Sequence, residues 1–344
     1  MNRSDSFLSV MIAGVGGASL GTEISKCLAL AGGYKIFGCD VSPTAYGLYD
    51  KHFSATFRVD RNNYIESVTA ACSQAGAEWL VAGGEQPMAL LSSASTQLAK
   101  HGIHLVANTP DIVQAFSDKA MTFERLSHAG IAVPRTMIIL GELDILAVGL
   151  PCIVKPATGS GGSVSVFFAI TSDEAMIYAD FIRRSGNVPI AQEYIPEDEG
   201  EFTIGVLSLP NGSIAGSIAL KRALDAKLSV SYRGRGGLVS SGYSQGHIDD
   251  YAFLRSQAEH IAETIGSRGP INIQGRVKNG VLIPFEINPR FSASTYLRAL
   301  AGFNEIDLLL RFMAFEEKPG PMSITPGWYL RSLTETYVPD SQIK

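Results

Sequence analysis

The chain has 344 residues, of which 46% are hydrophobic and 18% are charged, and its formal net charge is −5. This length suits two or three domains of a globular protein, and the acidic balance gives no general attraction to nucleic acid. No run of 18 apolar residues occurs, so we expect no membrane span, and the four scattered cysteines suit free thiols of a cytoplasmic protein without a signal peptide.

The first hundred residues alternate strands with helices. Apolar periodicity predicts strands over residues 8–13, 35–39 and 79–82, and helices over residues 20–30 and 64–75. This order of elements predicts a parallel sheet with right-handed crossover connections.

A glycine-rich turn follows the first predicted strand. Its spacing over residues 14–21, with Asp40 as an acid after the second strand, partly matches a dinucleotide-binding turn. Ser19 stands where that turn needs a third glycine or alanine, and the sequence lacks the lysine of a phosphate-binding P-loop. We therefore do not expect a dinucleotide site at this turn.

Two predicted helix starts carry charged side chains. The glycine pair at residues 83–84 follows a strand and opens a helix, which places Glu85 in the first turn. A carboxylate there either stabilises the helix dipole or contacts a ligand beyond the sheet edge. Ser117 or Asp118 caps a second helix that begins at Lys119, and this lysine alone is consistent with an exposed helix residue.

Residues 151–156 form a predicted strand that carries Lys155 near its end, and residues 157–163 form a glycine-rich loop of small residues. Backbone N–H groups in such a loop can approach a phosphate closely, because no Cβ intervenes. A flexible turn is the ordinary alternative. The lysine close before the loop favours phosphate binding.

The next predicted elements are a short strand over residues 189–195, an acidic loop over 197–201 and a hairpin over 202–220. Residues 223–247 have little periodicity and are predicted to form a mobile loop, and long loops in compact domains tend to be functional. Within it, Arg233 or Arg235 either clamps a ligand carboxylate or remains solvated. A helix is expected over residues 249–265.

A second hairpin is predicted around residues 278–280. If all three residues form the loop, Val277 pairs with Val281 and Ile273 pairs with Phe285. A two-residue turn would shift the register by one and set apolar side chains opposite polar ones. We therefore expect the longer loop. The apolar row of the second strand then comprises Val281, Ile283, Phe285 and Ile287.

The polar row of this hairpin carries Gln274, Glu286 and Asn288 on one face, because side chains alternate along a strand. Arg290 follows directly after the second strand. Carboxylate and amide oxygens beside guanidinium groups suit Mg²⁺ and polyphosphate. An ordinary amphipathic hairpin would instead turn such a face to water.

The spaced set of motifs resembles the ATP-grasp superfamily, and within it the branch related to the carbamoyl-phosphate synthase large chain. The resemblance rests on Glu-Ile-Asn-Pro-Arg at residues 286–290 after Gln274, and on Val-Lys-Pro at 154–156 before Gly-Ser-Gly-Gly at 159–162. It implies an α/β and α+β architecture with the ATP-grasp fold. It divides the chain into a Rossmann-like parallel α/β domain (1–108), linker helices with a lid subdomain (109–192) and an ATP-binding subdomain (193–344).

The resemblance also assigns roles to individual residues. The residues implied to bind the metal are Gln274, Glu286 and Asn288. The residues implied to contact ATP are Lys119, Lys155, Gly159, Ser160, Gly161, Gly162, Glu193, Tyr194, Ile195, Glu201 and Lys221. Among them, residues 193–195 are implied to form the hinge that pairs with adenine, and Glu201 is implied to bind the ribose hydroxyls. The implied catalytic residues are Lys155 and Arg290. The substrate residues are Glu85 and Arg222, together with the loop residues Arg233 and Arg235.

The activity implied by the resemblance is ADP-forming ligation of a small carboxylate to an amine through an acyl phosphate. ATP and Mg²⁺ are implied, with Mn²⁺ as an alternative metal, and a homodimer is a compatible assembly. Complete carbamoyl phosphate synthesis is not expected, because the chain has one copy of the motif set and no glutaminase segment. The alternatives are a carboxylase that phosphorylates bicarbonate and a nucleotide-binding regulator without turnover.

Overall fold

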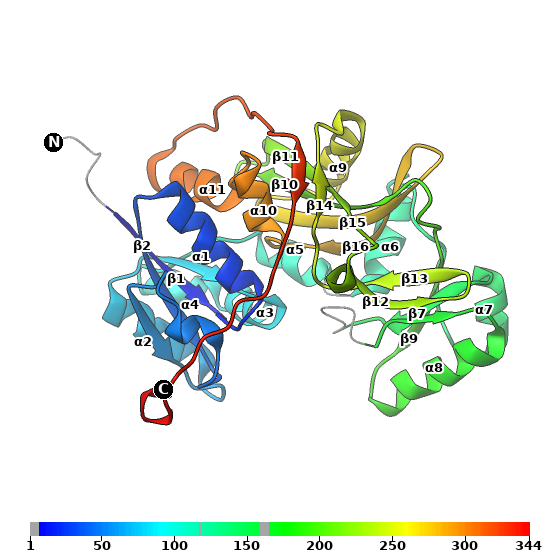
Figure 1. The fold of residues 1–344 in the computed structure, drawn as a ribbon, viewed down its shortest axis with the longest axis horizontal. Helices are drawn as coiled ribbons and strands as arrows, with labels where there is room; N and C mark the ends of the chain where they lie inside the picture. Colours follow the sequence, from blue (N-terminus) through cyan, green and yellow to red (C-terminus); the bar gives the residue numbers. More distant parts are fainter. Residues whose placement is uncertain (1–6, 117, 159–164) are drawn as a thin grey trace.

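The computed structural model describes residues 7–116, 118–158 and 165–344. The N-terminal part forms a parallel sheet with strand order β3-β2-β1-β4-β5 (Figure 1). Its strands are β1 (Leu8–Ala13), β2 (Tyr34–Asp40), β3 (Ala55–Arg58), β4 (Trp79–Ala82) and β5 (His104–Leu105). Its helices are α1 (Leu20–Ala31), α2 (Tyr64–Ala75), α3 (Glu85–Ser93) and α4 (Ser95–Lys100).

This sheet confirms the predicted parallel α/β domain. All five elements predicted for the first hundred residues are present to within one residue at each end. The edge strand β3 was not predicted, because its Ala-Thr-Phe-Arg sequence has no apolar run and none of its residues is buried. The two-residue strand β5 was also missed, since so short an element carries no periodicity.

The glycines after β1 allow close packing of helix α1. A Cβ on Gly21 would lie 2.0 Å from the Gly14 carbonyl oxygen, and one on Gly83 would lie 1.9 Å from the same atom. Asp40 accepts a hydrogen bond of 2.8 Å from the backbone N–H of Val15. Asp40, the acid that would contact the ligand in a dinucleotide site, therefore stabilises the glycine-rich turn instead.

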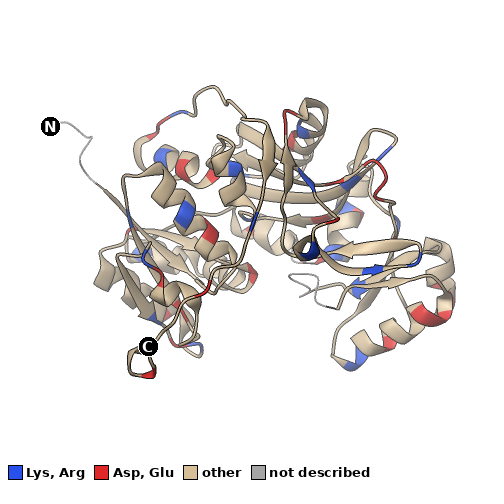
Figure 2. Cartoon of the chain, viewed as in Figure 1, with Lys and Arg blue, Asp and Glu red and all other residues tan. Residues whose placement is uncertain are grey.

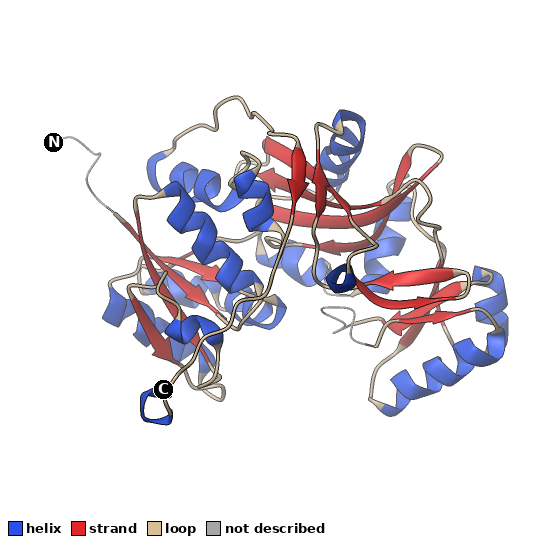
Figure 3. Cartoon of the chain, viewed as in Figure 1, coloured by secondary structure: helices blue, strands red, loops and turns tan. Residues whose placement is uncertain are grey.

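A four-stranded sheet with order β6-β9-β7-β8 lies in the segment predicted to contain the lid, and we call it the lid sheet. Its strands are β6 (Thr136–Ile138), β7 (Cys152–Pro156), β8 (Phe167–Ala169) and β9 (Pro189–Glu193). Helices α7 (Glu142–Val148) and α8 (Ser172–Arg184) cover one face, where Ile145 and Ile182 pack against Val154 (Figure 3). Thr171 is the N-cap of helix α8, because its hydroxyl accepts a hydrogen bond from the Glu174 N–H.

A six-stranded antiparallel sheet has the order β16-β15-β10-β11-β14-β17. Its strands are β10 (Glu201–Ser208), β11 (Ile214–Arg222), β14 (Gly246–Ile248), β15 (Pro270–Lys278), β16 (Val281–Asn288) and β17 (Gly327–Tyr329). Helices α5 (Pro110–Ala115), α6 (Lys119–His128) and α9 (Ala252–Thr264) share a core with one face. Helices α10 (Thr295–Leu300) and α11 (Glu305–Phe315) pack on the other face.

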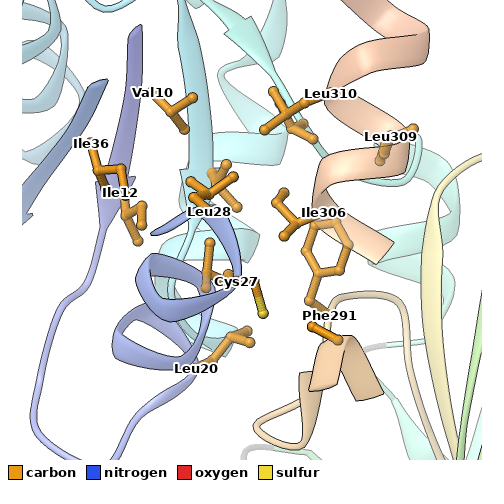
Figure 4. Packing of buried hydrophobic residues seen from close by; sticks show 14 of the residues in the cluster. Val10, Ile12, Leu20, Cys27, Leu28, Ile36, Phe291, Ile306, Leu309 and Leu310 are labelled. Atoms are coloured by element: carbon orange, nitrogen blue, oxygen red, sulfur yellow. The ribbon is translucent and has the colours of Figure 1, made fainter. Parts of the chain in front are cut away.

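One hydrophobic core joins the first and last parts of the chain. Leu28 of α1 lies beside Ile306 and Leu310 of α11, with Phe291 below them (Figure 4). The predicted divisions at residues 108 and 192 remain a prediction. Within the described ranges, no helix has the length and apolar character that crossing a membrane requires.

The register of the β15–β16 hairpin differs from the prediction. Lys278 pairs with Val281, so the turn has two residues, Asn279 and Gly280, both with positive φ. Such a turn follows the right-handed twist of the strands. A two-residue turn alone would set the polar side chains of one strand opposite the apolar side chains of the other. This does not happen, because a bulge at Phe285 inserts one extra residue into β16.

The bulge also changes which side chains enter the core. Leu282 and Ile287 pack in the core, whereas Val281 is 40% exposed and Phe285 faces the cleft described below. The predicted apolar row of Val281, Ile283, Phe285 and Ile287 is therefore wrong as a continuous row.

The prediction of an unstructured loop over residues 223–247 is also wrong. The segment contains the hairpin of β12 (Val230–Gly234) and β13 (Gly237–Ser240), as well as β14. Phe168 of the lid packs against Val239 and lies 6.1 Å from the Tyr232 ring, so the hairpin is stabilised by tertiary contacts that periodicity does not reveal.

Candidate active site

A cleft lies between the lid sheet and the six-stranded sheet. It brings together eight of the predicted site residues, namely Lys119, Lys155, Glu193, Tyr194, Ile195, Glu201, Gln274 and Glu286. Its apolar lining includes Ile153, Leu238 and Phe285. The predicted hinge at residues 193–195 begins with the last residue of β9 and continues into the following loop, and all three residues line the cleft.

Lys155 extends from β7 into the cleft with its side chain almost fully buried. Its ammonium donates to Gln192 Oε1 at 2.8 Å and to the Phe285 carbonyl at 3.1 Å. Burial, and to a lesser extent the Lys119 ammonium, lowers the pKa of Lys155 from 10.5 to about 7, although Glu286 opposes the shift. A phosphate beside this ammonium would favour the charged form.

The candidate metal face is formed by the paired strands β15 and β16. Gln274 lies directly opposite Glu286, and Asn288 is two residues further along. The described residues contain no group of three His, Cys, Asp or Glu side chains that could hold a metal ion. One carboxylate and two amides therefore suit Mg²⁺ only where phosphate oxygens complete its coordination.

A second cavity of about 500 Å³ shares Lys119 and Glu286 with the cleft and is also lined by Glu85, Asn288 and Arg290. The Arg290 guanidinium lies 2.9 Å from the Glu85 carboxylate and donates to Asn288 Oδ1 at 3.3 Å. Among described residues, the buried Asn288 Nδ2 and Arg290 Nε have no hydrogen-bond partner. An anionic ligand at the junction of cleft and cavity would satisfy both donors.

A family model for the ATP-grasp domain matches residues 116–294, more than half of the chain. The chain belongs to the ATP-grasp family. It is similar to the carbamoyl phosphate synthase large chain of Streptomyces coelicolor, with 27% identity over 61% of this chain and 19% of the relative. The large chain of Methanothrix thermoacetophila is 26% identical over 64% of this chain and 21% of its own. The match thus spans about a fifth of each relative.

Solved ATP-grasp structures share the fold. Biotin carboxylase from Campylobacter jejuni has a TM-score of 0.65 at 17% identity, covering 88% of this chain and 70% of its own. N5-carboxyaminoimidazole synthetase from Staphylococcus aureus has a TM-score of 0.63 at 17% identity, covering 93% and 80%. L-amino acid ligase from Bacillus licheniformis has a TM-score of 0.64 at 15% identity, covering 92% and 78%. The predicted ATP-grasp fold is confirmed.

Arg276 is a site residue that the sequence analysis did not single out. Its guanidinium donates to the Ile195 carbonyl at 2.6 Å, to Glu201 at 2.9 Å and to the Leu238 carbonyl at 3.1 Å, and it lies over the Tyr194 ring. Arg276 therefore links the predicted ATP-grasp hinge to the β12–β13 hairpin through hydrogen bonds. Its position two residues after Gln274 on the same strand face was the available signal.

The structure does not support the roles predicted for Lys221 and Arg222. Arg222 is buried, lies 3.2 Å from the Glu201 carboxylate and donates to the carbonyls of Ser229 and Tyr243, and it lines neither the cleft nor the second cavity. Lys221 lies on the opposite strand face, is exposed, and lines neither the cleft nor the second cavity. Adjacent strand residues cannot both face one site. Glu201 lines the cleft, but its ribose role stays a prediction because both arginines already contact it.

The predicted substrate contacts of Arg233 and Arg235 are not supported either. Both are exposed in the β12–β13 hairpin, and neither lines the cleft or the second cavity. Arg233 donates to the Leu224 carbonyl at 2.6 Å. The predicted phosphate-loop residues Gly159, Ser160, Gly161 and Gly162 lie outside the described residues.

We predict that ATP binding at pH 8 takes up a proton at Lys155. The side chain is largely neutral above its pKa of about 7 in the free protein, and nearby phosphates would raise that pKa. ATP affinity should therefore fall as the pH rises above 7. Proton uptake on ATP binding should disappear well below pH 7, where Lys155 is already charged. Titration calorimetry in buffers of different ionisation enthalpy measures the number of protons taken up on ATP binding.

The variant Lys155→Met keeps the apolar stem, so the fold should persist while ATP affinity and proton uptake are lost. Lys100→Met, at an exposed lysine at the end of α4 and outside the cleft, is the matched control. Unchanged affinity in Lys155→Met would remove Lys155 from the nucleotide site.

Proposed function

We propose that this ATP-grasp protein is an ADP-forming ligase that joins a small carboxylate to an amine. The observation that carries the proposal is the continuity of the nucleotide cleft with the second cavity at Lys119 and Glu286. In this arrangement ATP lies in the cleft and the acceptor lies in the cavity. Transfer of a phosphoryl group then takes place at their junction.

The residues of the chain have separate tasks in this reaction. Residues 193–195 line the adenine end, and Lys155 with Lys119 orients the phosphates. Gln274, Glu286 and Asn288 would hold Mg²⁺, which when bound neutralises phosphate charge. Arg290, kept in place by Glu85, positions the transferred group beside the acceptor. Both residues in this last pair line the cavity.

The proposed chemistry requires no covalent protein nucleophile. The acceptor carboxylate attacks the γ-phosphorus, and the bond to the bridging oxygen of ADP breaks. The amine then attacks the acyl carbon, phosphate leaves, and the amine loses a proton as the amide forms. Positioning and charge neutralisation supply most of the rate enhancement in phosphoryl transfer. A cytoplasmic location and homodimeric assembly complete the proposal, with Mg²⁺ rather than Mn²⁺ as the metal.

A bicarbonate-phosphorylating carboxylase is the second candidate. It is favoured by the similarity in fold to a biotin carboxylase at a TM-score of 0.65. A regulator without turnover is disfavoured, because Lys155, Gln274 and Glu286 are all present in one cleft.

The test is ADP release with pooled carboxylates and pooled amines, each omitted in turn, with hydroxylamine added to trap acyl phosphate as hydroxamate. Carboxylate-dependent hydroxamate and amine-dependent amide are expected. ADP release that needs only bicarbonate would identify the carboxylase instead. ATP binding without ADP release under every condition would identify the regulator.

A further inference from the structure

The outer surface of the lid carries an unusual concentration of exposed apolar side chains. On α7 and its flanks, Leu140 is 84% exposed, Leu143 is 80% exposed and Leu146 is 53% exposed. On α8, Ile177 is 66% exposed and Phe181 is 56% exposed. The two helices pack side by side on the same face of the lid sheet. We call these five residues the lid face.

The composition of α7 indicates that the lid face is covered by a partner. Ile145 and Val148 of this helix already fill the lid core, yet its opposite side is also apolar. Its acids, Glu142 and Asp144, lie in the first turn, so apolar side chains occupy the outer side of the helix as well as its inner side. Contiguous exposed apolar residues on a soluble protein commonly mark an interaction surface.

The lid face points away from the nucleotide cleft. Strand β7 alternates Val154, which packs under α7 and α8, with Ile153 and Lys155, which line the cleft. A partner on the lid face would therefore leave the cleft open to nucleotide.

We propose that the lid face is the interface between two copies of this chain. The exposed stripe of α8 reads Asp173, Ile177, Phe181 and Arg184, one residue per turn. In a two-fold antiparallel pairing, Asp173 of each copy meets Arg184 of the other, and Ile177 meets Phe181. The same two-fold axis brings both pairs of residues together, so the stripe on one copy is complementary to the same stripe on the other.

The charges around the lid face favour a second copy over a membrane. Asp173 lies at the first turn of α8 and Arg184 at its end, and acidic side chains also occur on α7 (Figure 2). The exposed acids Glu142 and Asp180 would be repelled by anionic lipid. Opposite charges at the two ends of α8 instead specify an antiparallel partner.

Sedimentation velocity over a range of protein concentrations tests the proposal on the full chain. The unmodified protein should form a concentration-dependent dimer. Asp173→Arg and Arg184→Asp should each weaken dimerisation about 10-fold, because like charges then meet. The combined variant restores opposite charges at both contacts and should recover the dimer. Ile177→Lys should also weaken it.

Phe253→Lys is the matched control, because Phe253 of α9 is 68% exposed outside the lid face and should not affect association. Thermal melts check that each variant folds. The proposal is overturned if the unmodified chain stays monomeric, if the dimer tolerates all lid variants, or if the double reversal fails to recover it. Binding of the monomer to phosphatidylcholine vesicles would also overturn it.

Discussion

Replacing Glu286 by Gln should reduce ADP formation by at least about 10²-fold, the scale for losing a preorganised electrostatic group. The substitution keeps the shape of the side chain and removes one negative charge from the candidate metal face. A hard cation such as Mg²⁺ prefers anionic oxygen, and the amides of Gln274 and Asn288 cannot replace it. Since Glu286 is only partly buried, the melting temperature of the free protein should change little.

The measurement is steady-state ADP release over a range of Mg²⁺ concentrations, with thermal melts in the presence and absence of Mg²⁺-ATP. Asn288→Ala should also reduce ADP formation but by a smaller factor, because a neutral amide attracts Mg²⁺ less strongly than a carboxylate does. Glu263→Gln, on the exposed side of α9, is the matched control. Normal turnover in Glu286→Gln, or an unfolded free protein, would make this strand structural rather than catalytic.

A second large effect is expected at the ion pair between Arg298 of α10 and Glu305 of α11. Neither side chain is exposed, and Nη1 of the arginine lies 2.9 Å from Oε1 of the glutamate. The other terminal nitrogen donates to Thr203 at 3.2 Å and to Asn272. Asn272 lies directly opposite Asn288 and on the same strand face as Gln274, so the ion pair lies next to the candidate metal face.

Arg298→Ala should lower the free energy of unfolding by about 3–5 kcal/mol, because it leaves the Glu305 carboxylate buried and unpaired. Replacing both residues, as Arg298→Met with Glu305→Leu, should cost much less, since no buried charge then lacks a partner. Urea-induced unfolding measures both values. Gly205→Ala should also destabilise the fold, because a Cβ there would lie 2.3 Å from Nη1 of Arg298.

Arg311→Ala is the control for the loss of an ion pair alone. Arg311 and Glu317 form a pair of the same length, but their side chains are 44% and 51% exposed. An exposed pair contributes only about 0–1 kcal/mol. The argument from burial fails if Arg298→Ala is no more destabilising than Arg311→Ala, or if the apolar double variant is as unstable as the single one.

Local pattern was sufficient for the elements whose apolar residues are close in sequence. The parallel sheet, α2 and the strand that carries Lys155 follow from periodicity, because each buries a stripe defined by its own residues. The expected register also placed Gln274 on the same strand face as Glu286, as the structure does, although the expected pairing of Ile273 with Phe285 is wrong because Ile273 pairs with Ile287. The two-residue turn and the bulge at Phe285 each shift the pairing by one residue, so together they leave Gln274 and Glu286 on the same face of the sheet.

Contacts between distant segments decided the rest. Arg222 and Arg276 look like free cations in the sequence, but both meet the buried Glu201, which only the pairing of β10 with β11 and β15 brings to them. Likewise, Glu85 reaches Arg290 across 205 residues of chain. Periodicity determines which face of an element is apolar. Which charges are neutralised depends on which elements pack together, because a buried charge needs a partner that the local sequence does not contain.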